Sequence, residues 1–63
     1  MAIRAARKTS GKTQAQVARE AKISEAQYQN IEYGKSEPNV RTAIRIASAL
    51  GVQSYTDFTK LFR

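Results

Sequence analysis

The amino-acid sequence predicts an all-α fold, a compact bundle of five short helices. Three observations support this prediction. Apolar residues recur three or four positions apart, as on one face of a helix, and no segment alternates apolar and polar residues as a half-buried strand does. Glycines stand where the helical patterns stop, at Gly11, Gly34 and Gly51. A chain of 63 residues can bury one small core, so residues 1–63 are expected to form a single domain.

The expected helices are joined by short connections and cover residues 2–10, 13–21, 24–33, 39–50 and 54–61. Gly34 is expected to supply a left-handed C-terminal cap for the third helix. The polar loop 35–38 ends in Pro38, and Asn39 then caps the fourth helix. Each helix presents one apolar stripe, and the stripes of the second, third and fourth helices hold Val17, Ala18, Tyr28, Ile31, Val40, Ala43, Ile46, Ala47 and Leu50.

The second and third helices are opened by two successive capping boxes. Thr13 is followed three residues later by Gln16, and Ser24 by Gln27, so each hydroxyl can accept from a backbone amide while the glutamine returns the bond. Only residues 21–23 separate the two helices, too few to let them lie antiparallel. Two short helices joined by such a turn form a helix-turn-helix, whose second helix is free to enter a DNA major groove.

Charge and composition restrict the classes of function. The 11 Lys and Arg against 5 Asp and Glu leave a formal net charge of +6, which suits a polyanion-binding protein or a merely soluble surface. The excess lies in residues 1–12 and 34–63, whereas residues 13–33 hold one more acid than base. The chain has no Cys or His, no paired acids on one face and no phosphate-binding glycine loop, so no enzyme activity, metal or cofactor is expected. No membrane span or signal peptide is visible, and a cytoplasmic location is expected.

An ordered set of residues at family spacing resembles the Cro and phage-repressor (Xre-type) helix-turn-helix domains: Thr13-Gln14, Val17-Ala18, Ile23-Ser24, Ile31-Glu32, Gly34, Pro38, Thr42, Ile46-Ala47 and Ala49-Leu50-Gly51-Val52. The resemblance covers about residues 3–58. It implies a lambda-repressor-like bundle of about five helices that binds operator DNA as a dimer and regulates transcription. It also implies a bacterial or phage-encoded protein associated with the nucleoid.

The resemblance places base-reading side chains on the third helix. Its first, second and sixth positions correspond to Glu25, Ala26 and Asn30. Asn30 can pair bidentately with adenine, and Gln29 can do the same if it reaches the base. Ala26 can pack on a thymine methyl group. Glu25 can accept from a cytosine amino group, or it can simply favour the helix dipole from the first turn.

Contacts to the DNA backbone are expected from polar side chains around the same helix: Gln14, Gln27, Tyr33, Lys35, Asn39 and Arg41. Gln14 matches a phosphate-contacting glutamine of the family, at the start of the second helix. Lys35, Asn39 and Arg41 surround the start of the fourth helix. Basic residues such as Arg19, Arg45 and Lys60 are expected to form an ordinary solvated face.

One further pair of residues and one further single position follow from the resemblance. Arg7 and Glu32 match a shielded ion pair between the first and third helices, and the alternative is that both are solvated. Lys22 stands where the family has glycine, so a left-handed backbone there would strain it by about 1 kcal/mol.

Dimer contacts are expected near the C-terminus, where Ile44 with Leu61 or Phe62 can form an apolar patch. The alternative is that Leu61 and Phe62 pack on their own core. Because helix-turn-helix half-sites lie about 34 Å apart, the subunits must meet away from the third helix, and a weak homodimer completed on DNA is expected.

The predicted function is therefore a sequence-specific DNA-binding transcriptional regulator, a repressor that reads a two-fold operator in double-stranded DNA. No small-molecule effector is expected, because the chain leaves no room for a sensing domain. Two alternatives stay open: an antitoxin whose DNA-binding domain also binds a toxin, and a protein-interaction module on the same fold. A toxin gene beside this one would favour the first alternative. Binding that is independent of DNA sequence, or absent, would favour the second.

Overall fold

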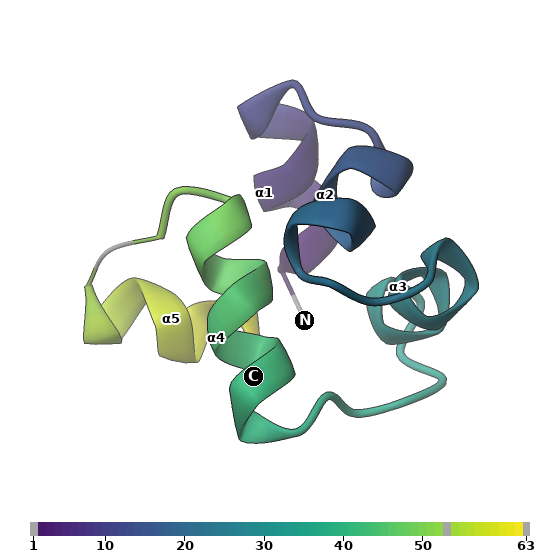
Figure 1. Cartoon of the computed structure of the whole chain (residues 1–63). Coiled ribbons are helices and arrows are strands. Elements are labelled where there is room, and N and C mark those ends of the chain that lie inside the picture. Colours follow the sequence, from purple (N-terminus) through teal and green to yellow (C-terminus); the bar gives the residue numbers. More distant parts are fainter. Residues whose placement is uncertain (1, 53, 63) are drawn as a thin grey trace.

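The structure, a computed structural model, describes residues 2–52 and 54–62, with only the backbone of Tyr55. The described residues form five helices and no strand: α1 (Ile3–Ser10), α2 (Gln14–Glu20), α3 (Glu25–Glu32), α4 (Val40–Ala49) and α5 (Tyr55–Leu61). The predicted all-α class and the order of the helices are confirmed. In Figure 1, α3 lies at one side of the molecule and α5 at the other, with α4 and α2 between them.

Each helix from α2 to α5 is preceded by a capping residue whose side chain accepts a hydrogen bond from a backbone amide. Thr13 and Gln16 form the complete capping box, with Thr13 Oγ1 accepting from the Gln16 amide and Gln16 Oε1 from the Thr13 amide. The prediction of a second complete box was wrong. Ser24 Oγ accepts from the Gln27 amide, but Gln27 returns no bond among the described residues, and its side chain is exposed. A hydroxyl alone is sufficient to cap the helix.

The ends of α2, α3 and α4 close in the same way. The residue after each helix cap adopts a left-handed backbone, and the next amide bonds back across the last turn, for example Lys35 N to Asn30 O at 2.8 Å. This is the Schellman arrangement, in which glycine is favoured because it has no Cβ. Gly34 and Gly51 occupy that position after α3 and α4, whereas Lys22 occupies it after α2, with φ 61°.

One apolar core joins the five helices. Fully or nearly fully buried side chains come from every helix and include Ile3, Val17, Tyr28, Ile31, Ile46 and Leu61. Burying an aliphatic side chain of this size contributes about 1.5–3 kcal/mol, which makes these residues the main source of stability in so short a chain.

Two assignments of core and surface were wrong. Val40, expected on the core stripe of α4, is 75 % exposed, because it occupies the first residue of the helix, beyond the reach of its neighbours. Leu61, expected on a dimer patch, is only 4 % exposed and belongs to the core. Its backbone carbonyl also accepts from the amide of Ala2 at 3.1 Å, so the end of α5 is joined to the start of the chain.

Lys12 connects the first two helices to the end of α4. Its Nζ donates to the carbonyl oxygen of Ala49 at 2.6 Å and to Glu20 Oε1 at 2.7 Å. A positive charge at the last carbonyls of a helix is favourable for the helix dipole. The half-buried Lys12 side chain thus has two acceptors for its charge.

Candidate nucleic-acid interface

α3 has one buried and one exposed face. Tyr28 and Ile31 point into the core, with 0 % and 1 % of their surface exposed. Ala26 and Asn30 lie on the opposite face and are exposed, and Glu25 is exposed beside Gln29, which is half-buried. Sequence periodicity predicted this division, because Tyr28 and Ile31 are spaced by three residues on a helix. The exposed face carries amide, carboxylate and methyl groups, which are the groups that read base edges.

The support of α3 is an ion pair shielded from solvent. Arg7 Nε donates to Glu32 Oε1 at 2.7 Å, and 15 % and 0 % of the two side chains are exposed. Tyr28 Oη donates to the same Glu32 oxygen at 3.1 Å, and Arg7 Nη1 donates to the carbonyl oxygen of Lys12 at 3.1 Å. The expected contact between α1 and α3 is therefore present, with a buried tyrosine as an additional member.

The pKa values of these groups follow from burial and hydrogen bonding. Burial raises the pKa of Glu32, but the hydrogen bonds from Arg7, Gln14 and Tyr28 outweigh it, and the pKa is lowered from its ordinary value of 4.5. Glu32 is therefore ionised at neutral pH. Burial and the neighbouring carboxylate raise the pKa of Tyr28, which keeps its hydroxyl protonated as a donor. The hydrogen bond to Glu32 raises the pKa of Arg7.

A chain of amides leads from this ion pair to the exposed face of α3. Gln14 Nε2 donates to Glu32 Oε2 and to Tyr33 Oη, and Gln14 Oε1 accepts from Gln29 Nε2 at 3.2 Å. Gln29 Nε2 also donates to Glu25 Oε2 at 3.2 Å. Two residues expected to contact DNA by themselves, Gln14 and Gln29, are thus connected within the protein. The sequence gives no signal for this contact, since Gln14 and Glu32 lie 18 positions apart.

The other residues expected at the DNA backbone lie around α3 in different environments. Lys35 and Arg41 are exposed, as is Tyr33, of which 53 % is exposed. Asn39 is exposed, but its Oδ1 accepts from the amide of Thr42 at 2.8 Å and so caps α4. Asn39 Nδ2 makes no hydrogen bond among the described residues and keeps both of its donors.

Comparison with known proteins agrees with this geometry. A family described as Helix-turn-helix matches residues 3–55, which is most of the chain. The chain belongs to the Cro/Xre-type helix-turn-helix family. Neither a curated protein nor a solved structure matches the chain.

The helix-turn-helix family consists of DNA-binding regulators and is generally not enzymatic. α2 and α3 are the two helices of the motif, and the turn between them holds Lys22. Within residues 2–52 and 54–62, no His, Cys, Asp and Glu residues gather as a metal site would require. In the same part of the chain, no helix is long and apolar enough to cross a membrane.

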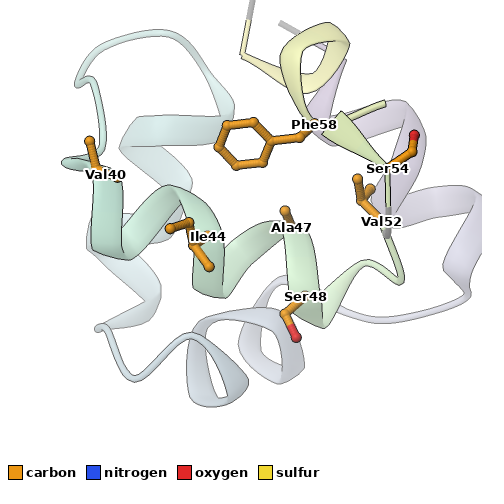
Figure 2. Close-up of a pocket in the computed structure, with 7 residues that line it drawn as sticks. All are labelled: Val40, Ile44, Ala47, Ser48, Val52, Ser54 and Phe58. Atoms are coloured by element: carbon orange, nitrogen blue, oxygen red, sulfur yellow. The ribbon is translucent and has the colours of Figure 1, made fainter. Parts of the chain in front are cut away.

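A largely apolar groove runs between α4 and α5. It consists of two hollows of about 390 and 460 Å³ that share Val40 and Phe58, and the larger one extends to Gly34, Glu37 and Pro38 of the loop between α3 and α4. In Figure 2 the ring of Phe58 extends from α5 over α4, on the side where Val40 and Ile44 lie. Of the three dimer candidates, Ile44 is 56 % exposed and lines this groove, Phe62 is half-buried against Phe58, and Leu61 lies beneath them in the core.

Proposed function

We propose that this protein is a sequence-specific transcriptional regulator of the repressor type, which reads a two-fold operator with α3 in the major groove. The exposed face of α3 carries the proposal, because Glu25, Ala26 and Asn30 offer an acceptor, a methyl group and a donor–acceptor pair on one rigid helix. The ion pair and the amide chain beneath α3 restrict its movement. Rigid placement of reading groups is what sequence discrimination requires.

The division of charge supports the same function. α3 contains no basic residue, whereas Lys35 and Arg41 are exposed on the segments that follow it. Contacts to phosphates supply affinity and register, and contacts to base edges supply specificity. We assign Lys35, Arg41, Tyr33 and the amide group of Asn39 to phosphates.

A second copy of this chain is the proposed occupant of the groove between α4 and α5. Half-sites of a helix-turn-helix dimer lie about 34 Å apart. The molecule measures only 27 × 23 × 18 Å, so two copies can span that distance only if each α3 lies toward the outside of the dimer. α5 lies at the side opposite α3 (Figure 1), and the groove that it forms with α4 is apolar and open there. A toxin or another protein in this groove is the competing outcome.

The proposed function is tested by titrating the protein against the DNA upstream of its own gene and against random duplex of equal length. We expect the upstream DNA to bind at least 10³-fold more tightly at physiological salt, with affinity falling steeply as salt rises. The measurement is made at two salt concentrations, because phosphate contacts weaken on both duplexes together. Equal affinity for both duplexes, or no binding, contradicts the proposal.

A further inference from the structure

The amide chain beneath α3 has a direction that is set at its buried end. Glu32 is an ionised carboxylate and can only accept hydrogen bonds. Gln14 must therefore turn its Nε2 toward Glu32, which leaves its Oε1 facing Gln29. Gln29 must in turn present its Nε2 to Gln14. The buried ion pair thus determines which way two amides point, without itself reaching the surface.

The pairing of donors with acceptors also determines which groups of the amide chain are left at the surface of α3. A carboxamide nitrogen carries two hydrogens. Gln29 Nε2 uses one toward Gln14 Oε1 and the other toward Glu25 Oε2, both at 3.2 Å. No N–H of Gln29 is left for a base. The groups that remain at this edge are acceptors, namely Oε1 of Gln29 and the carboxylate of Glu25. Glu25 is exposed.

We propose that Glu25 and Gln29 form an acceptor-only edge, which selects adenine or cytosine over guanine or thymine at one position of the DNA strand it faces. Gln29 is a positioning residue here, since it holds Glu25 in place and turns its own oxygen outward. The inference rests on the proposed function and specifies the base chemistry that this site takes.

The base preference follows from the groups that bases present in the major groove. Adenine and cytosine offer an amino donor there, whereas guanine O6 and thymine O4 are acceptors and would repel the edge. Such an edge separates A·T from T·A and C·G from G·C, but it does not separate A·T from C·G. Asn30 differs, because its amide offers both a donor and an acceptor and so can recognise adenine alone. The two sites are therefore expected to leave different signatures in one operator.

The test removes single amino groups from the DNA. An operator is first selected from a pool of random duplexes, and each adenine or cytosine of a half-site is then replaced by purine or 2-pyrimidinone, which lack only the amino group. At the position facing Glu25, the wild-type protein is expected to lose about tenfold in affinity. Glu25→Gln, which gives the edge a donor, and Gln29→Met, which releases Glu25, are expected to lose no more than about twofold there.

The matched control is Asp57→Asn on α5, which makes the same change of charge as Glu25→Gln at an exposed residue far from α3. This variant is expected to keep the full tenfold loss. If the wild type tolerates every replacement, or if Glu25→Gln and wild type lose equally at every position, the inference is overturned while specific binding stands. If no duplex is selected over random DNA, the proposed function fails and the inference with it.

Discussion

Asn30 is an exposed residue of α3, and its side chain makes no hydrogen bond among the described residues. Asparagine is a poor helix former, so its exposed amide is better explained by a contact outside the protein. Its backbone carbonyl accepts from the amides of Lys35 and Ser36, so the side chain lies beside the hydrogen-bonded C-terminal end of α3.

Asn30→Ala is expected to weaken operator binding by about 1–3 kcal/mol and to leave binding to random duplex nearly unchanged, since only base contacts distinguish the two. Fluorescence anisotropy titrations on both duplexes measure the difference. An equal loss on operator and random DNA would assign Asn30 to a phosphate instead.

Lys22 adopts the left-handed conformation that Gly34 and Gly51 adopt after α3 and α4. Lys22→Gly is therefore expected to raise the free energy of unfolding by about 1 kcal/mol, because it removes the steric cost of a Cβ at positive φ. For a domain of this size the melting temperature should rise by about 4–8 °C. Lys22→Ala is the control, since it removes the charge and keeps the Cβ. A similar gain from alanine would show that charge, and not backbone strain, is responsible.

α3 is held by a buried ion pair to another helix. Its buried Glu32 carboxylate is neutralised by Arg7 from α1, and removing either partner leaves a shielded charge uncompensated. Arg7→Met and Glu32→Gln are each expected to destabilise the fold by more than 1 kcal/mol, up to about 3 kcal/mol. Arg19→Met, at an exposed position of α2, is expected to change the free energy of unfolding by less than about 0.5 kcal/mol. Chemical denaturation measures all three, and equal midpoints would rule out a structural role for the pair.

The lowered pKa of Glu32 makes this contribution depend on pH. Between the lowered pKa of Glu32 in the folded state and its ordinary pKa of 4.5 in the unfolded chain, Glu32 is ionised in the folded state and protonated in the unfolded state. The unfolded state therefore binds more protons in this pH window. The stability due to Glu32 is therefore complete above about pH 4.5 and is lost as the pH falls through the lowered pKa. We expect the difference in free energy of unfolding between wild type and Glu32→Gln to shrink between pH 6 and pH 3. A constant difference over this range would mean that Glu32 titrates as an ordinary exposed carboxylate.

The helices could be located from the sequence because their signals are local. Thr13, Ser24 and Gly34 act on amides and carbonyls within one turn of themselves, so neighbouring residues are enough to recognise them. The interface is less predictable. Gln14 and Gln29 each look like a contact for DNA, yet their partner within the protein is distant in sequence. Which way an amide points depends on that partner, and only the packing of α2 on α3 supplies it.

At the scale of the whole molecule, the groove between α4 and α5 is the proposed contact with a second copy. Val40 and Ile44 are exposed, so replacing both with glutamine should preserve the fold and its helical circular dichroism. If a second copy occupies the groove, this double variant should bind the operator at least about tenfold more weakly. Its binding curve should also be less cooperative. Leu61→Ala is the contrasting variant and should destabilise the fold by about 2–5 kcal/mol, because Leu61 is in the core. A folded double variant that binds operator with unchanged cooperativity would place the dimer contact elsewhere.

The error at Leu61 shows the limit of sequence patterns at this scale. Periodicity tells which face of a helix is apolar, but it cannot tell whether that face meets its own core or another molecule. Leu61 and Ile44 are both apolar, yet Leu61 is buried in the core, where its carbonyl accepts from the Ala2 amide, and Ile44 is 56 % exposed. Val40 was misassigned for the same reason, since a stripe can extend past the element that covers it.

The hydrogen bond from the Ala2 amide to the Leu61 carbonyl can be followed by hydrogen exchange. That amide precedes the first helix and has no partner within α1, so its proton is protected from exchange with solvent only while the start of the chain and the end of α5 stay in contact. Its exchange rate therefore measures how often these two segments separate. A rate equal to that of the α4 amides would mean that they separate only when the core opens, and a faster rate would mean that this contact opens by itself.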